Sequence, residues 1–134
     1  MFKFIICFLF LLNLYNCEKK EETLVFEVNP NIDNEKEFNV NVGQEFIIKL
    51  YCSINSWVFL NKNEKDTITL IKTDYQTVHD TDEELGLGRK GYLFYFFKAN
   101  SKTEEPKLLK FTDTYSYLKQ TNPIPKFIIK INVN

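Results

Sequence analysis

Alternating apolar and polar side chains decide the fold, and they are first seen in FNVNVGQEFIIKL, residues 38–50. Apolar residues occupy the even positions from Phe38 to Val42 and again from Phe46 to Leu50, with Gly43-Gln44 between the two runs. A period of two places alternate side chains on one face of a β-strand. Residues 38–50 therefore predict a hairpin that turns at Gly43-Gln44 and packs one face on the core.

Other short runs along the chain have the same character. In residues 127–134, FIIKINVN, the odd positions are all apolar and the even positions from Lys130 onward are polar. Residues 92–97 are apolar at every position, which predicts a central strand covered on both faces. Weaker runs are found at residues 24–28, 57–60, 67–72 and 108–111. No segment of 12 or more residues has the apolar spacing of an amphipathic helix.

These runs predict an all-β fold. About seven or eight short strands in one domain indicate an immunoglobulin-like antiparallel β-sandwich, with a small barrel as the alternative closure. In the sandwich, Trp57 is expected to pack between the sheets against Phe94 or Phe96.

The first 17 residues have the layout of an export signal. Lys3 precedes an apolar run from Phe4 to Leu14, and a polar stretch follows. This run is shorter than the roughly 20 residues that span a bilayer. Residues 14–17, Leu-Tyr-Asn-Cys, resemble a bacterial lipoprotein signal, in which Cys17 would carry the lipid; alternatively, Cys17 lies near an ordinary cleavage point. We expect export, either by secretion or to an endomembrane, lysosomal or periplasmic compartment, with membrane attachment only through Cys17.

The remaining residues, 18–134, suit one domain. The chain has 17 basic and 18 acidic residues, intermixed, so the basic stripe of a nucleic-acid-binding surface is missing. Cys52 is the one cysteine beyond residue 17, and a disulfide would require Cys17 to reach it. A core rich in aromatic residues must therefore supply the stability, and we expect a monomer.

Catalytic and metal-binding candidates are few. A nucleophilic dyad would have to combine Cys52 with His79, the one histidine in the chain, and neither has the surroundings of a known nucleophile. Residues 80–84 contain four carboxylates but lack the spacing of a calcium loop. Residues 86–91 contain Gly-x-Gly but lack the Lys-Ser/Thr ending of a phosphate-binding loop and precede a strand. The sequence predicts no enzyme, no cofactor and no metal site.

The order of these features resembles the chagasin-like inhibitors of papain-family cysteine proteases. Residues 41–50 are similar to the opening strands of that family, Trp57 follows after a short loop, residues 85–91 stand where the family has a Gly-x-Gly-Gly loop, and residues 92–99 match the long strand after it. The resemblance covers roughly residues 38–134. It implies an immunoglobulin-type sandwich that presents three loops at one end and blocks the cleft of a papain-family protease without covalent chemistry.

The three loops implied by this resemblance depart from the family's motifs. Residues 51–56 lack the Pro and Gly of the first loop, residues 89–90 replace a Gly of the second, and residues 115–117 keep the aromatic character but not the Arg-Pro of the third. The alternative function is therefore an exported binding or adhesion module with no protease target. If inhibition is retained, the residues implied to contact the protease are Ser53, Ile54, Asn55, Ser56, Gly86, Leu87, Gly88, Arg89, Tyr115 and Tyr117.

Overall fold

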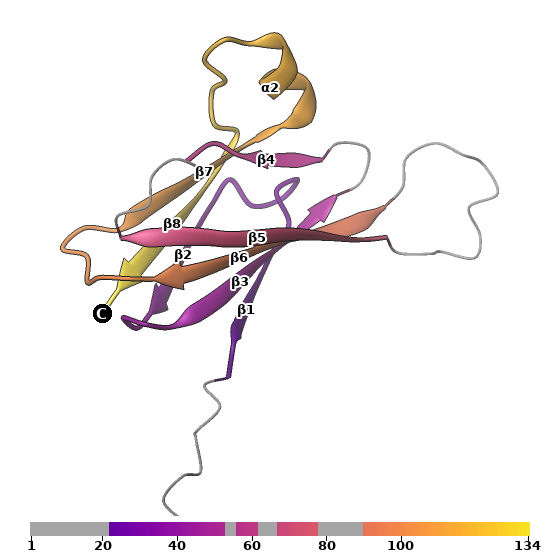
Figure 1. Cartoon of the computed structure of the whole chain (residues 1–134). Helices are drawn as coiled ribbons and strands as arrows, with labels where there is room; N and C mark the ends of the chain where they lie inside the picture. Colours follow the sequence, from indigo (N-terminus) through magenta and orange to yellow (C-terminus); the bar gives the residue numbers. More distant parts are fainter. Residues whose placement is uncertain (1–21, 53–55, 62–66, 78–89) are drawn as a thin grey trace, which may run out of the picture.

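The computed structural model describes residues 22–52, 56–61, 67–77 and 90–134, and in these residues two four-stranded sheets pack face to face (Figure 1). No helix in these ranges is long and apolar enough to cross a membrane. The all-β sandwich prediction is confirmed. The first sheet has the order β1 (Leu24–Val28), β3 (Glu45–Cys52), β6 (Gly91–Ala99), β5 (Ile68–Thr77). The second sheet has the order β2 (Glu35–Val40), β8 (Phe127–Val133), β7 (Lys107–Asp113), β4 (Trp57–Phe59), and the short helix α2 (Thr114–Lys119) follows β7.

Residues 38–50 form strands of two different sheets, so the predicted hairpin is wrong. β2 pairs in parallel with β8, and β3 pairs antiparallel with β6. Gly43 adopts φ +84° where the chain passes between the sheets, and its N–H donates to the carbonyl of Ala99 at 2.8 Å. β1 also pairs in parallel with β3, so both sheets are mixed, where the sequence predicted antiparallel sheets. Alternation specifies which face of a strand is apolar, but it does not specify the neighbouring strand.

The core is built from the inward side chains of both sheets. Phe46 stacks on Phe97 in the first sheet, with ring centroids 5.4 Å apart, and Phe111 stacks on Phe127 in the second, at 5.3 Å. Phe59 lies 5.3 Å from both Phe97 and Phe111 and so connects the two pairs. All five rings are buried. Burial of this much aromatic surface supplies the main stabilisation of a domain without a disulfide among its described residues.

The apolar run of β6 is fully buried on one face only, which corrects the prediction for residues 92–97. Burial alternates along the strand, and Tyr92, Phe94 and Phe96 are half-buried on the outer face. Lysines cover part of this face: the Nζ of Lys49 lies 4.3 Å from the ring centroid of Tyr92, and the Nζ of Lys72 lies 4.4 Å from that of Phe96. Long lysine side chains can cover apolar surface while their ammonium groups remain in water.

Trp57, the first residue of β4, packs against another residue of its own sheet and not against Phe94 or Phe96. Its ring meets Phe127 edge-on, with centroids 6.2 Å apart, and the side chain is only partly buried. The predicted contact is wrong because Phe94 and Phe96 point away from the interior of the sandwich.

Candidate functional site

The ends of five strands converge at one end of the sandwich. Gly91, the first residue of β6, pairs with Cys52 at the end of β3 and with Thr77 at the end of β5. In the second sheet, Trp57 pairs with Asp113. Residues 53–55 and 78–89 lie outside the described residues, but the residues that flank them belong to this end. We call it the loop end.

Helix α2 is joined to the loop end by hydrogen bonds at its start. The carbonyl of Ser56 accepts hydrogen bonds from the N–H of Thr114 at 3.0 Å and from its hydroxyl at 3.1 Å. Residues 56 and 114 are far apart in sequence, so these bonds place the segment before β4 next to the helix. Two of the three regions implied by the resemblance therefore share one surface in the described residues.

Asp113 caps α2 and holds the segment that returns from it. Its carboxylate accepts hydrogen bonds from the N–H of Ser116 at 2.8 Å and from the Ser116 hydroxyl at 2.9 Å, and it forms an ion pair with Lys126. The side chain is only 4% exposed. Hydrogen bonding to Lys126, followed by the bonds from Ser116, lowers the pKa of Asp113 to about 2. The carboxylate thus stays ionised and fixes both ends of residues 114–126.

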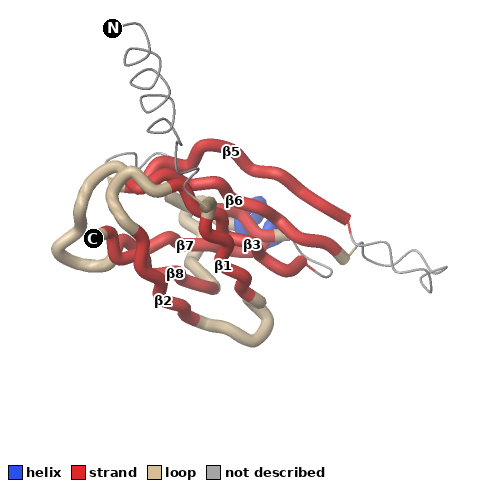
Figure 2. The backbone as a smooth tube through the Cα atoms, turned by 90° about the horizontal axis from the view of Figure 1, so that it is seen from below, coloured by secondary structure: helices blue, strands red, loops and turns tan. Residues whose placement is uncertain are grey.

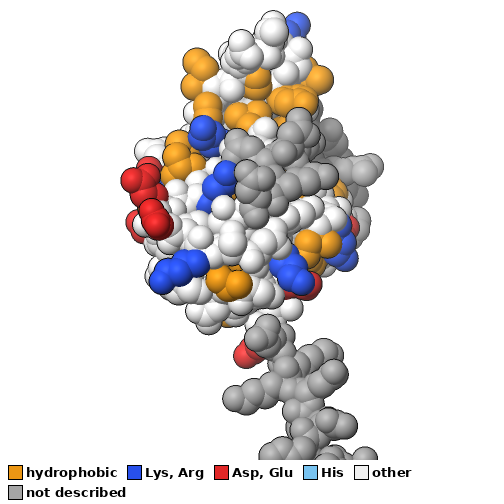
Figure 3. All heavy atoms as spheres, turned by 60° about the vertical axis from the view of Figure 1, so that its left-hand side comes forward, with side chains coloured by type: hydrophobic (Ala, Val, Ile, Leu, Met, Phe, Trp, Pro, Cys, Tyr) orange, Lys and Arg blue, Asp and Glu red, His pale blue; other side chains and the backbone are white. Residues whose placement is uncertain are grey.

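This segment presents a group of exposed apolar side chains, which we call the α2 patch. Tyr115, Tyr117 and Leu118 come from the helix and are 67%, 44% and 76% exposed, and Ile124, on the returning chain, is 72% exposed. Figure 3 shows apolar side chains gathered at this tip of the molecule. Ile124 is held near the helix because its N–H donates to the Gln120 side chain at 3.4 Å. Contiguous exposed apolar surface is typical of a binding site.

Two hydrogen bonds join the sheets beneath this surface. The indole N–H of Trp57 donates to the carbonyl of Tyr51 at 3.2 Å, and the hydroxyl of Tyr95 donates to the carbonyl of Trp57 at 2.6 Å. Burial raises the pKa of Tyr95 to about 12, so its hydroxyl keeps its proton. β4 is therefore tied to β3 and β6 close to the loop end.

Cys52 lies at the loop end but has the environment of a structural residue. The side chain is buried, and its Sγ lies 3.8 Å from the carbonyl oxygen of Leu50. Burial raises the pKa of the thiol to about 11, which keeps it protonated and unreactive near neutral pH. His79, its one conceivable partner in a dyad, lies outside the described residues. Within the described ranges, no three His, Cys, Asp or Glu side chains are grouped so that they could hold a metal ion.

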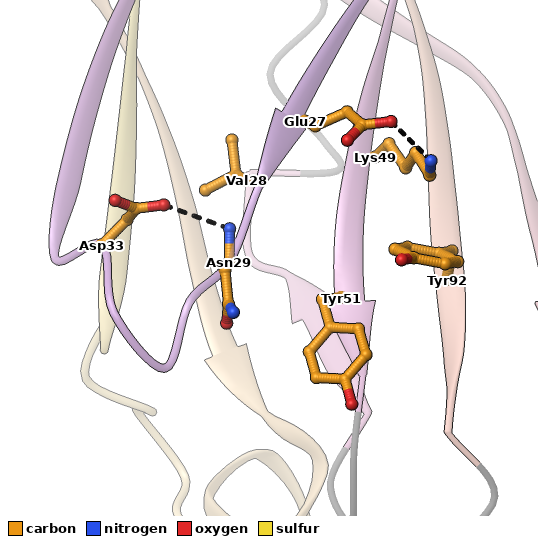
Figure 4. A pocket seen from close by; sticks show the side chains of 7 residues that line it. All are labelled: Glu27, Val28, Asn29, Asp33, Lys49, Tyr51 and Tyr92. Atoms are coloured by element: carbon orange, nitrogen blue, oxygen red, sulfur yellow. Dashed lines mark hydrogen bonds and ion pairs between the residues drawn. The ribbon is translucent and has the colours of Figure 1, made fainter.

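An open hollow of about 420 Å³ lies on the outer face of the first sheet (Figure 4). Lys49 forms an ion pair with Glu27 at 2.5 Å across it, and its ammonium also lies over the ring of Tyr92. Asp33 accepts a hydrogen bond from the N–H of Asn29 at 3.1 Å. Asp33 also forms an ion pair with Lys36 at 3.0 Å. Each charged group of the hollow thus has a partner within the protein, so the hollow has no convergent set of polar groups aimed at a ligand.

Three of the ten residues implied to contact a protease lie in the described part of the chain. Ser56, Tyr115 and Tyr117 lie at the loop end, where Tyr115 and Tyr117 belong to a short helix although a loop was implied. Residues 53–55 and 86–89 lie outside the described residues, as does Cys17. Sequence reasoning missed Leu118 and Ile124. Their signal was the presence of large apolar residues in an otherwise polar, proline-containing segment, TYSYLKQTNPIPK.

No family model matches the sequence, and no curated protein matches it. Solved structures do match it. The cysteine protease inhibitor EhICP2 from Entamoeba histolytica is similar with a TM-score of 0.60 and 11% identity over 84% of this chain and 98% of that chain. This protein has the fold of the chagasin-like inhibitors. PbICP-C, solved in complex with falcipain-2, is similar to this chain with a TM-score of 0.52 and 14% identity, over 84% of this chain and 100% of that one. At these identities the similarity shows the fold alone.

Proposed function

We propose that this chagasin-like protein inhibits papain-like cysteine proteases by blocking the active-site cleft with its loop end. The observation that carries the proposal is the convergence of Ser56, Gly91 and helix α2 at one end of a sandwich with this fold. Further support comes from the structural neighbours, one of which is a cysteine protease inhibitor and the other of which is bound to falcipain-2.

The proposed mechanism is non-covalent occlusion. Residues 53–56 would cover the catalytic thiol of the protease, while residues 86–89 and the α2 patch would contact the two sides of the cleft. Tyr115, Tyr117 and Leu118 offer the large apolar surface that often dominates protein interfaces. The capped helix and the inter-sheet hydrogen bonds hold this surface in place before binding, which lowers the entropic cost of association.

In this proposal the protein is a binding partner and not an enzyme. The protonated thiol of Cys52 supports that view, because a buried thiol with a raised pKa is a poor nucleophile. The proposed inhibitor needs no cofactor. Export directed by residues 1–17, with or without lipid on Cys17, is part of the same proposal, since it would bring the inhibitor to compartments that contain such proteases.

The decisive test is a titration of the purified protein into papain, a lysosomal cathepsin and falcipain-2 while hydrolysis of a small substrate is followed. We expect reversible inhibition, with the inhibitor still intact after prolonged incubation. No inhibition of any of the three enzymes at micromolar concentration would contradict the proposal. The binding or adhesion module, which the departures from the family's loop motifs favour, would then take its place.

A further inference from the structure

The turn between β1 and β2, residues 29–34, also lies at the loop end. β1 runs parallel to β3 toward this end, and Val28, its last residue, pairs with Leu50. After the turn, the carbonyl of Asn34 accepts a hydrogen bond at 3.3 Å from the N–H of Ile128, near the start of β8. In Figure 2 the turn joins β1 and β2 on the side of the molecule away from the C-terminus. We call residues 29–34 the edge turn, because it connects the outermost described strands of the two sheets.

Local hydrogen bonds fix the shape of the edge turn. The carbonyl of Asn29 accepts hydrogen bonds from the N–H of Ile32 at 3.0 Å and from that of Asp33 at 2.8 Å. The side chain of Asn29 accepts another from the N–H of Asn31 at 3.1 Å. Asp33 returns a bond, because its carboxylate accepts from the N–H of Asn29 at 3.1 Å while it pairs with Lys36 at 3.0 Å. A turn held by this many bonds needs little further ordering when it meets a partner, which lowers the entropic cost of binding.

The edge turn presents one large apolar side chain to solvent. Among the large apolar side chains of the described residues, Ile32 is the most exposed, at 77%, and it does not pack against the core. A single exposed apolar residue needs no explanation by itself. The meaning of Ile32 therefore depends on what lies beside the turn that holds it.

The edge turn continues the surface of the loop end. Asn29 and Asp33 line the same hollow as Tyr51, the residue before the last of β3 (Figure 4). Residues 53–56, which are proposed to cover the catalytic thiol of a protease, follow β3 directly in the chain. In the second sheet, β8 alone separates β2 from β7, which leads into α2, so the edge turn and the helix begin about two strand spacings apart, or roughly 10 Å. A protein that covers the loop end can therefore reach both.

We propose that Ile32 is a further contact with the inhibited protease and packs against an apolar surface of the enzyme beside its active-site cleft. This inference rests on the proposed function, because it assigns Ile32 to the same interface. The contacted surface is apolar because a hydrocarbon side chain gains free energy only by leaving water. The loop end would then bind with two rigid apolar projections, the edge turn and the α2 patch.

The first test compares Ile32→Asp with the matched control Val42→Asp. Val42 is also β-branched and is 50% exposed, but it lies at the opposite end of the sandwich, where its N–H donates to the carbonyl of Asn134. For at least one of papain, a lysosomal cathepsin and falcipain-2, Ile32→Asp should raise the inhibition constant about tenfold, because a charge would be buried in an apolar contact. Val42→Asp should change it by less than about twofold. Denaturation midpoints of both variants should stay near that of wild type.

The outcomes separate this inference from the function on which it rests. If Ile32→Asp is as good an inhibitor as wild type of every enzyme that wild type inhibits, the contact of Ile32 is overturned and the proposed function stands. If wild type inhibits none of the three enzymes, the proposed function falls and the contact falls with it.

A second test detects the contact without a substitution. The N–H groups of Ile32 and Asp33 bond only within an exposed turn, so they exchange with solvent whenever the turn opens. Hydrogen exchange is measured on wild type alone and in complex with the enzyme that it inhibits most tightly. Exchange should slow in residues 31–34 and 115–118 of the complex, but not in residues 100–104 at the opposite end. Slower exchange in residues 115–118 with none in residues 31–34 would place the edge turn outside the interface.

Discussion

At the scale of single residues, Asp113 holds the segment that carries the proposed binding surface. It ends β7, caps α2 and holds Lys126 just before β8 begins. Because Asp113 has several polar partners and little exposure, its contribution to stability depends on its negative charge. Its lowered pKa means that folding stabilises the ionised form, and this makes the stability of the protein dependent on pH.

We expect Asp113→Asn to reduce stability by about 1–3 kcal/mol at pH 7, because neutral Asn loses the charge-assisted bonds to Lys126 and Ser116. The sign follows from the lowered pKa: the contribution of the carboxylate is complete above its ordinary pKa of 3.8 and is lost as pH falls toward about 2. The difference between the variant and wild type should therefore shrink between pH 4 and pH 2. Urea denaturation midpoints at pH 7, 4 and 2 measure it.

The exposed Glu104→Gln is the control for this experiment, and it should follow wild type at each pH. A gap between Asp113→Asn and wild type that is as large at pH 2 as at pH 7 would show that the carboxylate does not act through its charge.

At the scale of elements, the three-residue strand β4 is the weakest part of the second sheet and adjoins the loop end. Such a short edge strand has few ladder bonds, so contacts to other elements must hold it. The hydrogen bonds between Trp57, Tyr51 and Tyr95 supply these contacts across the two sheets. The position of the segment before β4 thus depends on the first sheet as well as on its partner β7.

We expect Tyr95→Phe to cost about 1–2 kcal/mol, because the ring is retained while the carbonyl of Trp57 loses its donor. The matched control is Tyr92→Phe, on the outer face of the same strand, which should change stability by less than about 0.5 kcal/mol. Guanidinium denaturation of both variants measures the difference. Equal effects of the two substitutions would mean that the bond from Tyr95 to Trp57 contributes nothing to holding β4.

At the scale of the whole molecule, function depends on segments that are far apart in sequence acting as one surface. Ser56, Gly91 and Tyr115 belong to three separate parts of the chain, and strand pairing together with the bond from Thr114 to Ser56 brings these parts to one end. The α2 patch extends this surface beyond the residues that the sequence indicated. Substitutions across the loop end should therefore all affect the same property, the proposed inhibition of a protease.

We expect Tyr117→Ala and Leu118→Ala each to weaken protease inhibition by about 1–3 kcal/mol with little effect on folding, because both side chains are exposed. Asn55→Ala and Gly88→Glu should weaken inhibition as well. Lys102→Ala, in the connection between β6 and β7 at the opposite end, should have no effect. Inhibition constants and denaturation midpoints of the same preparations separate binding from stability. Inhibition that is unchanged in Tyr117→Ala and Leu118→Ala would exclude the α2 patch from the interface.

The sequence by itself determined the fold class and the composition of the core. Alternation in residues 46–50 and 127–133 identifies the buried faces, because a strand exposes every second side chain to the same side. The residues around Cys52 also indicated that it is not a nucleophile, which agrees with its buried, protonated thiol. The order of strands, Trp57 and Gly-x-Gly was enough to indicate the chagasin-like fold, which the structural comparisons confirm.

Only the tertiary structure decided which strands are neighbours and which side chains form the candidate site. Residues 38–42 and 46–50 looked like a hairpin, yet they belong to different sheets, because pairing depends on long-range contacts that alternation does not encode. The apolar run of β6 did not indicate that its outer face is covered by lysine side chains instead of by another layer of the fold. Leu118 and Ile124 resemble core residues in the sequence; they are exposed because Asp113 and Lys126 fix a short helix and its return outside the sandwich, where no sheet can cover them.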